Sequence, residues 1–135
     1  MPESAPDNTT VVRRSFDALN AGDLDAVFEC FQDDCVFDGS RVAEGVYEGQ
    51  EHYRAFLQGA LDSLSPQHEF TLEAEGDHVL ASCRIVGRGH ASGAPIEMPV
   101  AYVYRLREGL IAHQTIYADI EEARAAFRRA STEST

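Results

Sequence analysis

A stretch near the start of the chain, Ala18–Gly39, places the tightest constraint on what the sequence folds into. The segment Asn20–Gly22 predicts the end of one helix, because glycine readily adopts the left-handed conformation found just after helix C-termini. Asp23 is a typical N-cap for a second helix. Apolar residues at helical spacing then follow at Leu24, Val27, Phe28 and Phe31.

The acidic pair Asp33–Asp34 predicts the end of this second helix, and Cys35–Phe37 predicts the start of a strand. Two helices that meet at a sharp angle before a strand form one wall of a cone. The rest of the chain supplies the other wall. We expect helices at 8–19, 50–64 and 120–130, a short strand at 46–47, and longer strands at 69–75, 79–88, 96–107 and 110–119.

Helices followed by strands joined through tight turns indicate an α+β fold. We predict a cone in which a curved antiparallel sheet wraps around the N-terminal helices. The whole chain, 1–135, has the length of one domain, and 44% of its residues are hydrophobic, which suffices for a core. The polar, proline-containing start and the polar end of the chain predict loose tails at 1–7 and 131–135.

The amino-acid composition limits which binding partners and which cellular compartment we expect. The net charge of −12 argues against nucleic acid or an anionic membrane as a partner, because phosphate binding needs clustered cations. The sequence shows no membrane-spanning run and no signal-peptide pattern. Cys30 and Cys83 lie on apolar stripes and Cys35 makes the count odd, so we expect reduced cysteines in a cytoplasmic protein.

Every cation in the chain is an arginine, and lysine is absent. An acidic surface of this kind suits a high-salt cytoplasm, in which carboxylates keep a protein hydrated. It equally suits a bias towards GC-rich codons. Both explanations stay open from the sequence.

A cone of this size is too wide for side chains to fill, so we expect it to hold a small apolar molecule. Strand alternation predicts which residues face the interior. The expected ligand contacts are aromatic: Phe16, Phe37, Tyr53, Phe56, Tyr104 and Tyr117. The expected catalytic groups are Asp38, Tyr102 and His113. In this scheme His113 or Asp38 takes a proton, and a tyrosine hydroxyl stabilises the developing oxyanion.

Each of these residues also has a purely structural interpretation. His113 is equally compatible with a hydrogen-bonded core histidine, and Asp38 with a cap on the loop at Gly39–Ser40. The tyrosines are at least as well explained as wall residues. Asp119 is best explained as the cap of the final helix.

Other kinds of site find no support in the sequence. The five histidines show no HxH or HExxH spacing, so no metal site is predicted. No Walker motif, GxGxxG or GxSxG occurs, and we expect no cofactor.

The segment ALNAGDLDAVFECFQDD resembles the opening of ketosteroid-isomerase-like and SnoaL-like proteins of the NTF2-like superfamily. The likeness continues weakly through Gly45–Gly49 and Arg107–Gly109 to Tyr117–Asp119. It implies the same cone-shaped fold and a homodimer. One fold hosts many activities, so the resemblance does not choose among them.

The catalytic pattern of the steroid isomerases is not matched. Aligned through this segment, their inward tyrosine falls on Ser15 and their second acid on Tyr102. Their aspartate base falls on Gly39, one residue after Asp38, and a shift of one residue on a strand reverses the side to which a side chain points. Classical steroid isomerisation is therefore not expected.

Two classes of function follow. The first is a cofactor-free isomerase, cyclase or hydrolase that uses acid/base chemistry on a small apolar molecule. The second is a non-catalytic binding or dimerisation module. For a homodimer, the strand faces expected to point outward supply apolar surface at Ala101, Val103, Leu110, Ala112, Ile116 and Ala118.

Overall fold

The computed structural model of the protein describes residues 7–42, 45–63, 66–88 and 93–133. Its helices are α1 (Asn8–Asn20), α2 (Leu24–Phe28), α3 (Gln50–Ser63) and α4 (Ile120–Glu133), with a 3-10 turn η1 (Ser40–Val42). Its strands are β1 (Phe31–Asp38), β2 (Val46–Glu48), β3 (Gln67–Glu75), β4 (His78–Arg88), β5 (Pro95–Arg107) and β6 (Leu110–Tyr117). Because α4 continues to Glu133, the predicted C-terminal tail is shorter than expected. Residues 1–6 and 134–135 of the predicted tails lie outside the described residues.

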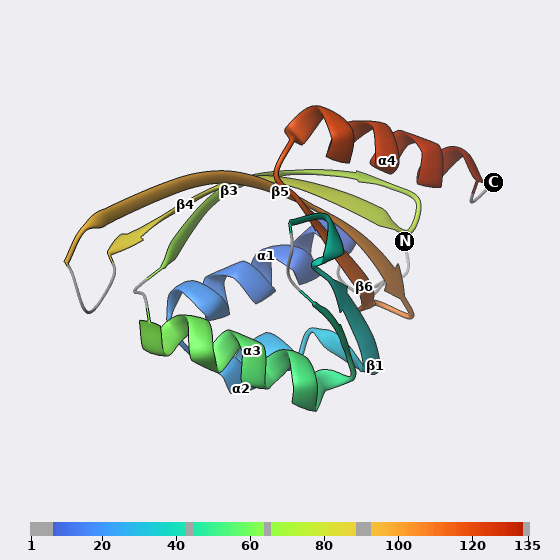
Figure 1. Ribbon diagram of the computed structural model, residues 1–135. Coiled ribbons are helices and arrows are strands. Elements are labelled where there is room, and N and C mark those ends of the chain that lie inside the picture. The colour runs from blue at the N-terminus through green and yellow to red at the C-terminus, as the bar shows by residue number, and fades with distance from the viewer. Residues whose placement is uncertain (1–6, 43–44, 64–65, 89–92, 134–135) are drawn as a thin grey trace.

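The six strands form one curved sheet in the order β2-β1-β6-β5-β4-β3. Figure 1 shows the sheet arching over α1, α2 and α3, while α4 lies on its outer, convex side. The α+β cone predicted from the sequence is confirmed. The sheet is mixed rather than fully antiparallel, because β1 runs parallel to β6. β1 enters directly from α2 beside the start of β6, where the Ile111 amide donates to the Cys30 carbonyl at 2.8 Å.

The break between the first two helices forms as the sequence predicts. Gly22 has a φ of 75°, and its amide donates to the Leu19 carbonyl at 3.0 Å. The Asp23 carboxylate then accepts from the Ala26 amide at 3.1 Å and caps α2. These contacts satisfy backbone groups that helix ends leave unpaired, so the chain turns sharply here.

The second helix is shorter than its apolar stripe indicates. It ends at Phe28, and Phe31 begins β1, where it pairs with Ile111 of β6. Phe31 is buried in the same core either way. The helical spacing was therefore a correct guide to burial and a wrong guide to conformation, because strand pairing overrides local propensity.

An irregularity in β6 decides which of its side chains face the helices. Leu106 pairs with Ile111 and Arg105 pairs with His113, so Ala112 is an extra residue opposite the continuous strand β5. Such a bulge reverses the alternation of side chains beyond it. Ile111 therefore faces the helices, and after the bulge Gln114 does so in place of His113.

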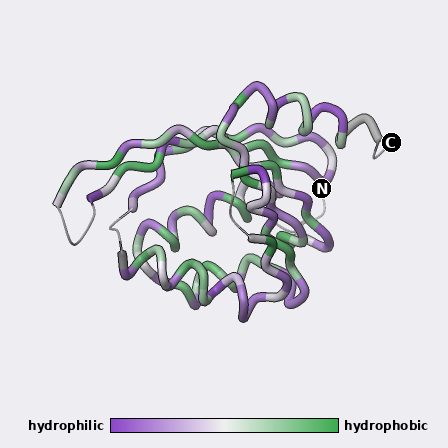
Figure 2. Tube along the Cα trace, in the orientation of Figure 1, coloured by the Kyte–Doolittle hydropathy of each residue, from purple (hydrophilic) through white to green (hydrophobic). Residues whose placement is uncertain are grey.

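The convex side of the sheet carries a second, smaller core. Phe127 and Ala123 of α4 pack over Ala101, Leu80 and Tyr117. Figure 2 shows α4 alternating between hydrophobic and hydrophilic residues, as expected for a helix with one buried face.

This packing covers most of the apolar strand surface on which the homodimer prediction rested, while Leu110 stays half-buried. Ala101 and Ala112 are buried, Val103 packs against the α4 core, and Ile116 and Ala118 line the inner cavity. The expectation that Ile116 and Ala118 point outward was wrong, because the bulge at Ala112 reverses them. The homodimer itself stays a prediction.

The surface is dominated by carboxylates, and its arginines form ion pairs in exposed positions. Arg84, for example, lies between Glu69 and Glu97, and Arg107 contacts Asp34 at 2.8 Å. With a net charge of −12, repulsion among the remaining carboxylates destabilises the compact state at low ionic strength. We expect the melting temperature to rise across a KCl series from dilute buffer to molar salt. A flat series would leave codon bias as the explanation of the acidic composition.

None of the helices in the described ranges has the length and hydropathy that a membrane span requires.

Candidate functional site

A cavity of about 400 Å³ lies inside the cone, between the helices and the concave face of the sheet. The helices contribute Phe16 and Leu19 from α1 and Tyr53, Phe56 and Leu57 from α3. The sheet contributes residues from β1, β3, β4, β5 and β6. Its walls are largely aromatic and aliphatic, which is typical of pockets for small organic molecules.

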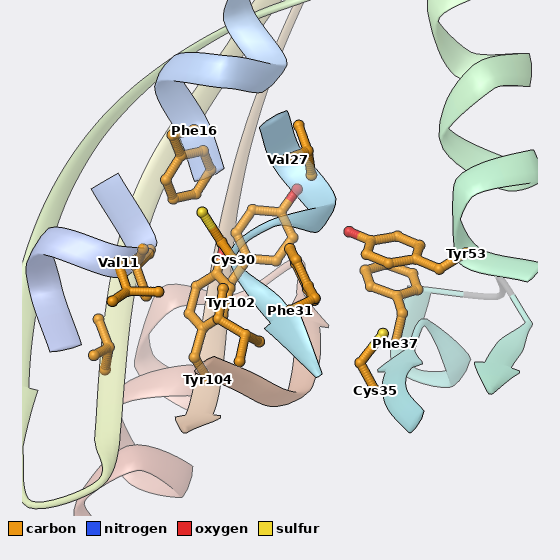
Figure 3. Close-up of a cluster of buried hydrophobic side chains, with 14 of the residues drawn as sticks. Val11, Phe16, Val27, Cys30, Phe31, Cys35, Phe37, Tyr53, Tyr102 and Tyr104 are labelled. Atoms are coloured by element: carbon orange, nitrogen blue, oxygen red, sulfur yellow. The ribbon is translucent and has the colours of Figure 1, made fainter. Parts of the chain in front are cut away.

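Three polar side chains in the wall form a buried chain of hydrogen bonds. The Tyr53 hydroxyl donates to Gln114 Oε1 at 3.1 Å, and Gln114 Nε2 donates to the Tyr104 hydroxyl oxygen at 3.3 Å. Gln114 lies opposite Tyr104 in the β5–β6 ladder, and both are almost fully buried. Figure 3 shows the Tyr53 ring stacked on Phe37, and this contact holds the first member of the hydrogen-bonded series in place.

Tyr102 stands two residues before Tyr104 on the same face of β5, with 6.0 Å between the ring centroids. Within the described part of the chain, no hydrogen bond partner contacts its hydroxyl. Burial raises the pKa of Tyr102 above its ordinary value, so the phenol stays protonated at neutral pH. It is a neutral hydrogen bond donor in the cavity wall.

His68 of β3 also lines the cavity and was not among the predicted site residues. The Asn20 side chain holds its backbone, accepting from the His68 amide at 2.7 Å and donating to its carbonyl at 3.0 Å. His68 is only 8% exposed, and its buried Nδ1 has no hydrogen-bond partner among the described residues. Burial lowers the pKa of His68 to about 4, so the imidazole is neutral at pH 7.

Strand alternation contained the signal for His68. Phe70 and Leu72 are apolar residues that alternate with polar ones in β3, and extending the same period by one step reaches His68. Strand alternation could not place Gln114 on the inner face, because only the bulge at Ala112 turns it inward.

Six of the predicted site residues do line the cavity: Phe16, Phe37, Tyr53, Phe56, Tyr102 and Tyr104. The other three, Asp38, His113 and Tyr117, lie on the opposite face of the sheet. Tyr117 packs in the α4 core, with the Arg41 guanidinium 5.1 Å from its ring centroid. Their predicted inward facing was wrong, because β6 reverses at its bulge and β1 places Phe37, not Asp38, on the inner side.

Asp38 and His113 are nevertheless neighbours on that outer side. The Asp38 carboxylate accepts from the Ser40 hydroxyl at 2.6 Å and the Ser40 amide at 3.0 Å, which lowers the pKa of Asp38. This is the loop cap that the sequence offered as the alternative interpretation. His113 is half-buried, its Nδ1 lies 3.4 Å from the Thr115 hydroxyl, and burial lowers its pKa.

The cavity wall is electrically neutral. Its residues, as far as the structure describes them, include no carboxylate and no guanidinium. Among the described residues, no group of three or more histidine, cysteine or acidic side chains is arranged to hold a metal ion. The wall therefore offers hydrogen bonds and apolar contact, and no formal charge at neutral pH.

Residues 12–114 match the SnoaL-like domain family. The chain belongs to this family. No curated protein matches the sequence of this SnoaL-like domain at a significant level. Among solved structures, a proposed polyketide cyclase from Xanthomonas campestris pv. campestris is 25% identical, with a TM-score of 0.76 over 87% of this chain and 94% of that one.

Two further structures share the fold of the SnoaL-like domain. A protein from Catenulispora acidiphila with a ketosteroid-isomerase-like fold, solved with trimethylamine, is 16% identical, with a TM-score of 0.73 covering 93% of this chain and 95% of that chain. The epoxide hydrolase/cyclase-like enzyme SalBIII, which acts in pyran ring formation in salinomycin, is 21% identical, with a TM-score of 0.73 covering 82% and 88%. These likenesses confirm the NTF2-like fold.

The positions that match the steroid isomerase pattern do not rebuild that site in this SnoaL-like domain. Ser15 lines the cavity, but its hydroxyl donates to the Val12 carbonyl of its own helix at 2.7 Å. Asp38 lies outside the cavity, and Tyr102 replaces the second acid with a phenol.

Proposed function

We propose that this SnoaL-like domain binds a small, uncharged and largely apolar molecule inside the cone. The observation that supports this proposal best is the 400 Å³ cavity whose polar groups are all neutral. Burying an unpaired charge costs far more free energy than burying a paired neutral group, so a charged ligand would be excluded. An apolar ligand gains free energy by leaving water for the aromatic wall.

The second candidate is catalysis, as a cofactor-free cyclase or isomerase. Tyr102 favours it, because a protonated phenol in the cavity wall polarises a carbonyl or epoxide oxygen of a bound molecule. The cavity also holds a flexible substrate folded near the geometry of ring closure, which lowers the entropic barrier. The polyketide cyclase and the cyclase-like enzyme among the similar structures point the same way.

Two features of the wall favour binding without turnover. The carboxylate expected to act as a base, Asp38, faces away from the cavity. His68 is the imidazole that the described wall does contain, and its low pKa makes it a weak base. Binding is therefore the first candidate, and any turnover relies on polarisation and positioning.

The test fills the cavity from within. Ile116→Trp places an indole in the space between the sheet and the helices, whereas Thr71→Trp adds the same ring to the exposed face of β3. We expect Ile116→Trp to weaken binding of 9-fluorenone, a rigid tricyclic ketone, by roughly 100-fold or more, and Thr71→Trp to leave it unchanged. Isothermal titration calorimetry measures both, and circular dichroism checks that each variant is folded.

Equal affinities in the wild type and Ile116→Trp would contradict binding inside the cone. Mass spectrometry of the compounds recovered from a ligand screen separates the two candidates. Unchanged molecules support a binding module, and cyclised or isomerised products support an enzyme.

A further inference from the structure

Gln114 gives the hydrogen-bonded chain in the cavity wall a direction. Its Oε1 accepts from Tyr53, so its Nε2 is the end that points to Tyr104. The Tyr104 oxygen accepts that bond, which leaves the Tyr104 hydroxyl proton to be donated elsewhere. Across the described ranges no protein group accepts that proton.

The site therefore presents two phenol protons on one strand. Tyr104 is 1% exposed and Tyr102 is 7% exposed, and both side chains line the cavity. A ligand that fills the cavity and supplies no acceptor leaves these donors unpaired, which costs free energy. A ligand with a suitably placed oxygen removes that cost.

We propose that Gln114 is a positioning residue that directs the Tyr104 proton into the cavity, so that the site selects ligands carrying a hydrogen-bond acceptor oxygen, such as a ketone or an ether. This inference rests on the proposed function, because it names the chemical class of the molecule bound there. Tyr102 supplies the second donor to the same oxygen. A side chain at 114 that only fills space would provide neither direction nor selectivity.

The experiment compares two probes of nearly equal shape, 9-fluorenone and fluorene. The ketone has an acceptor oxygen and the hydrocarbon has none. In the wild type we expect 9-fluorenone to bind roughly tenfold more tightly than fluorene. The carbonyl stretch of bound 9-fluorenone should shift to lower wavenumber, because two hydrogen bonds weaken the C=O bond.

Two variants test the donor and its positioning residue. Tyr104→Phe removes the donor with almost no change in volume, and Gln114→Met removes the directing amide. In both, the preference for the ketone should fall towards parity and the carbonyl shift should shrink. Gln58→Met, on the exposed side of α3, is the matched control and should keep the wild-type preference.

The outcomes are distinguishable. If Gln114 is only structural, Gln114→Met weakens both probes equally and the ketone preference survives, which overturns the inference. Equal binding of both probes to the wild type also overturns it while leaving the proposed function standing. Binding of neither probe overturns both. Should Gln114→Met fail to fold, Tyr104→Phe alone decides, because a retained ketone preference in that variant excludes Tyr104 as the donor.

Discussion

Replacing His68 with glutamine is expected to remove much of the acid sensitivity of folding between pH 6.5 and pH 4. Burial lowers the pKa of His68 in the folded protein to about 4, while the unfolded chain keeps the ordinary value near 6.5. Between these values the unfolded state binds more protons, so stability falls as the pH falls. At pH 4 the lowered pKa of His68 destabilises the folded state by about 3 kcal/mol. Above pH 6.5 this destabilisation is absent.

Urea unfolding at a series of pH values measures this effect as a difference between two curves. The wild type should lose about 3 kcal/mol more than His68→Gln on going from pH 7 to pH 4. His52→Gln is the matched control, because it makes the same replacement at an exposed histidine at the start of α3. If the free energy of unfolding of the wild type and of His68→Gln changed in parallel with pH, the imidazole would not be buried away from water.

The second large effect is expected from Phe16→Ala. Phe16 is 2% exposed, stacks on Phe70 at 4.5 Å between ring centroids, and also contacts the rings of His68, Tyr102 and Tyr104. Its truncation removes the aromatic surface that joins α1 to the sheet. We expect the free energy of unfolding to drop by about 3–5 kcal/mol.

Met98→Ala provides the comparison for Phe16→Ala, because Met98 also lines the cavity but is 45% exposed. Its free energy of unfolding should change by less than about 1 kcal/mol. A similar loss in the two variants would mean that the cavity wall around Phe16 rearranges to fill the space. Both values come from the same urea unfolding experiment.

The side chains that line the cavity differ in their chemistry from those expected from the sequence. An aspartate and a histidine inside the cone would have formed an acid/base pair, whereas the described wall residues include phenols, the Gln114 amide and a neutral imidazole. The outer pair of Asp38 and His113 lies near η1, where Asp38 caps the loop. A neutral wall favours selective binding over proton transfer.

The sequence alone determined the features that depend on neighbours along the chain. Gly22 and Asp23 end one helix and begin the next through contacts within four residues, so their roles were readable in advance. The alternation in β5 placed Tyr102 and Tyr104 on the inner face, because an uninterrupted strand keeps its period of two. The fold class followed from such local patterns added together.

Tertiary structure alone decided the chemistry of the cavity. The bulge at Ala112 exists because of how β6 pairs with β5, and nothing local in the sequence marks it. That single extra residue puts Gln114 and Ile116 inside and leaves His113 and Tyr117 outside, since a one-residue shift reverses every side chain beyond it. Similarly, β1 begins at Phe31 because pairing with β6 outweighs the helical spacing of the apolar residues that precede it.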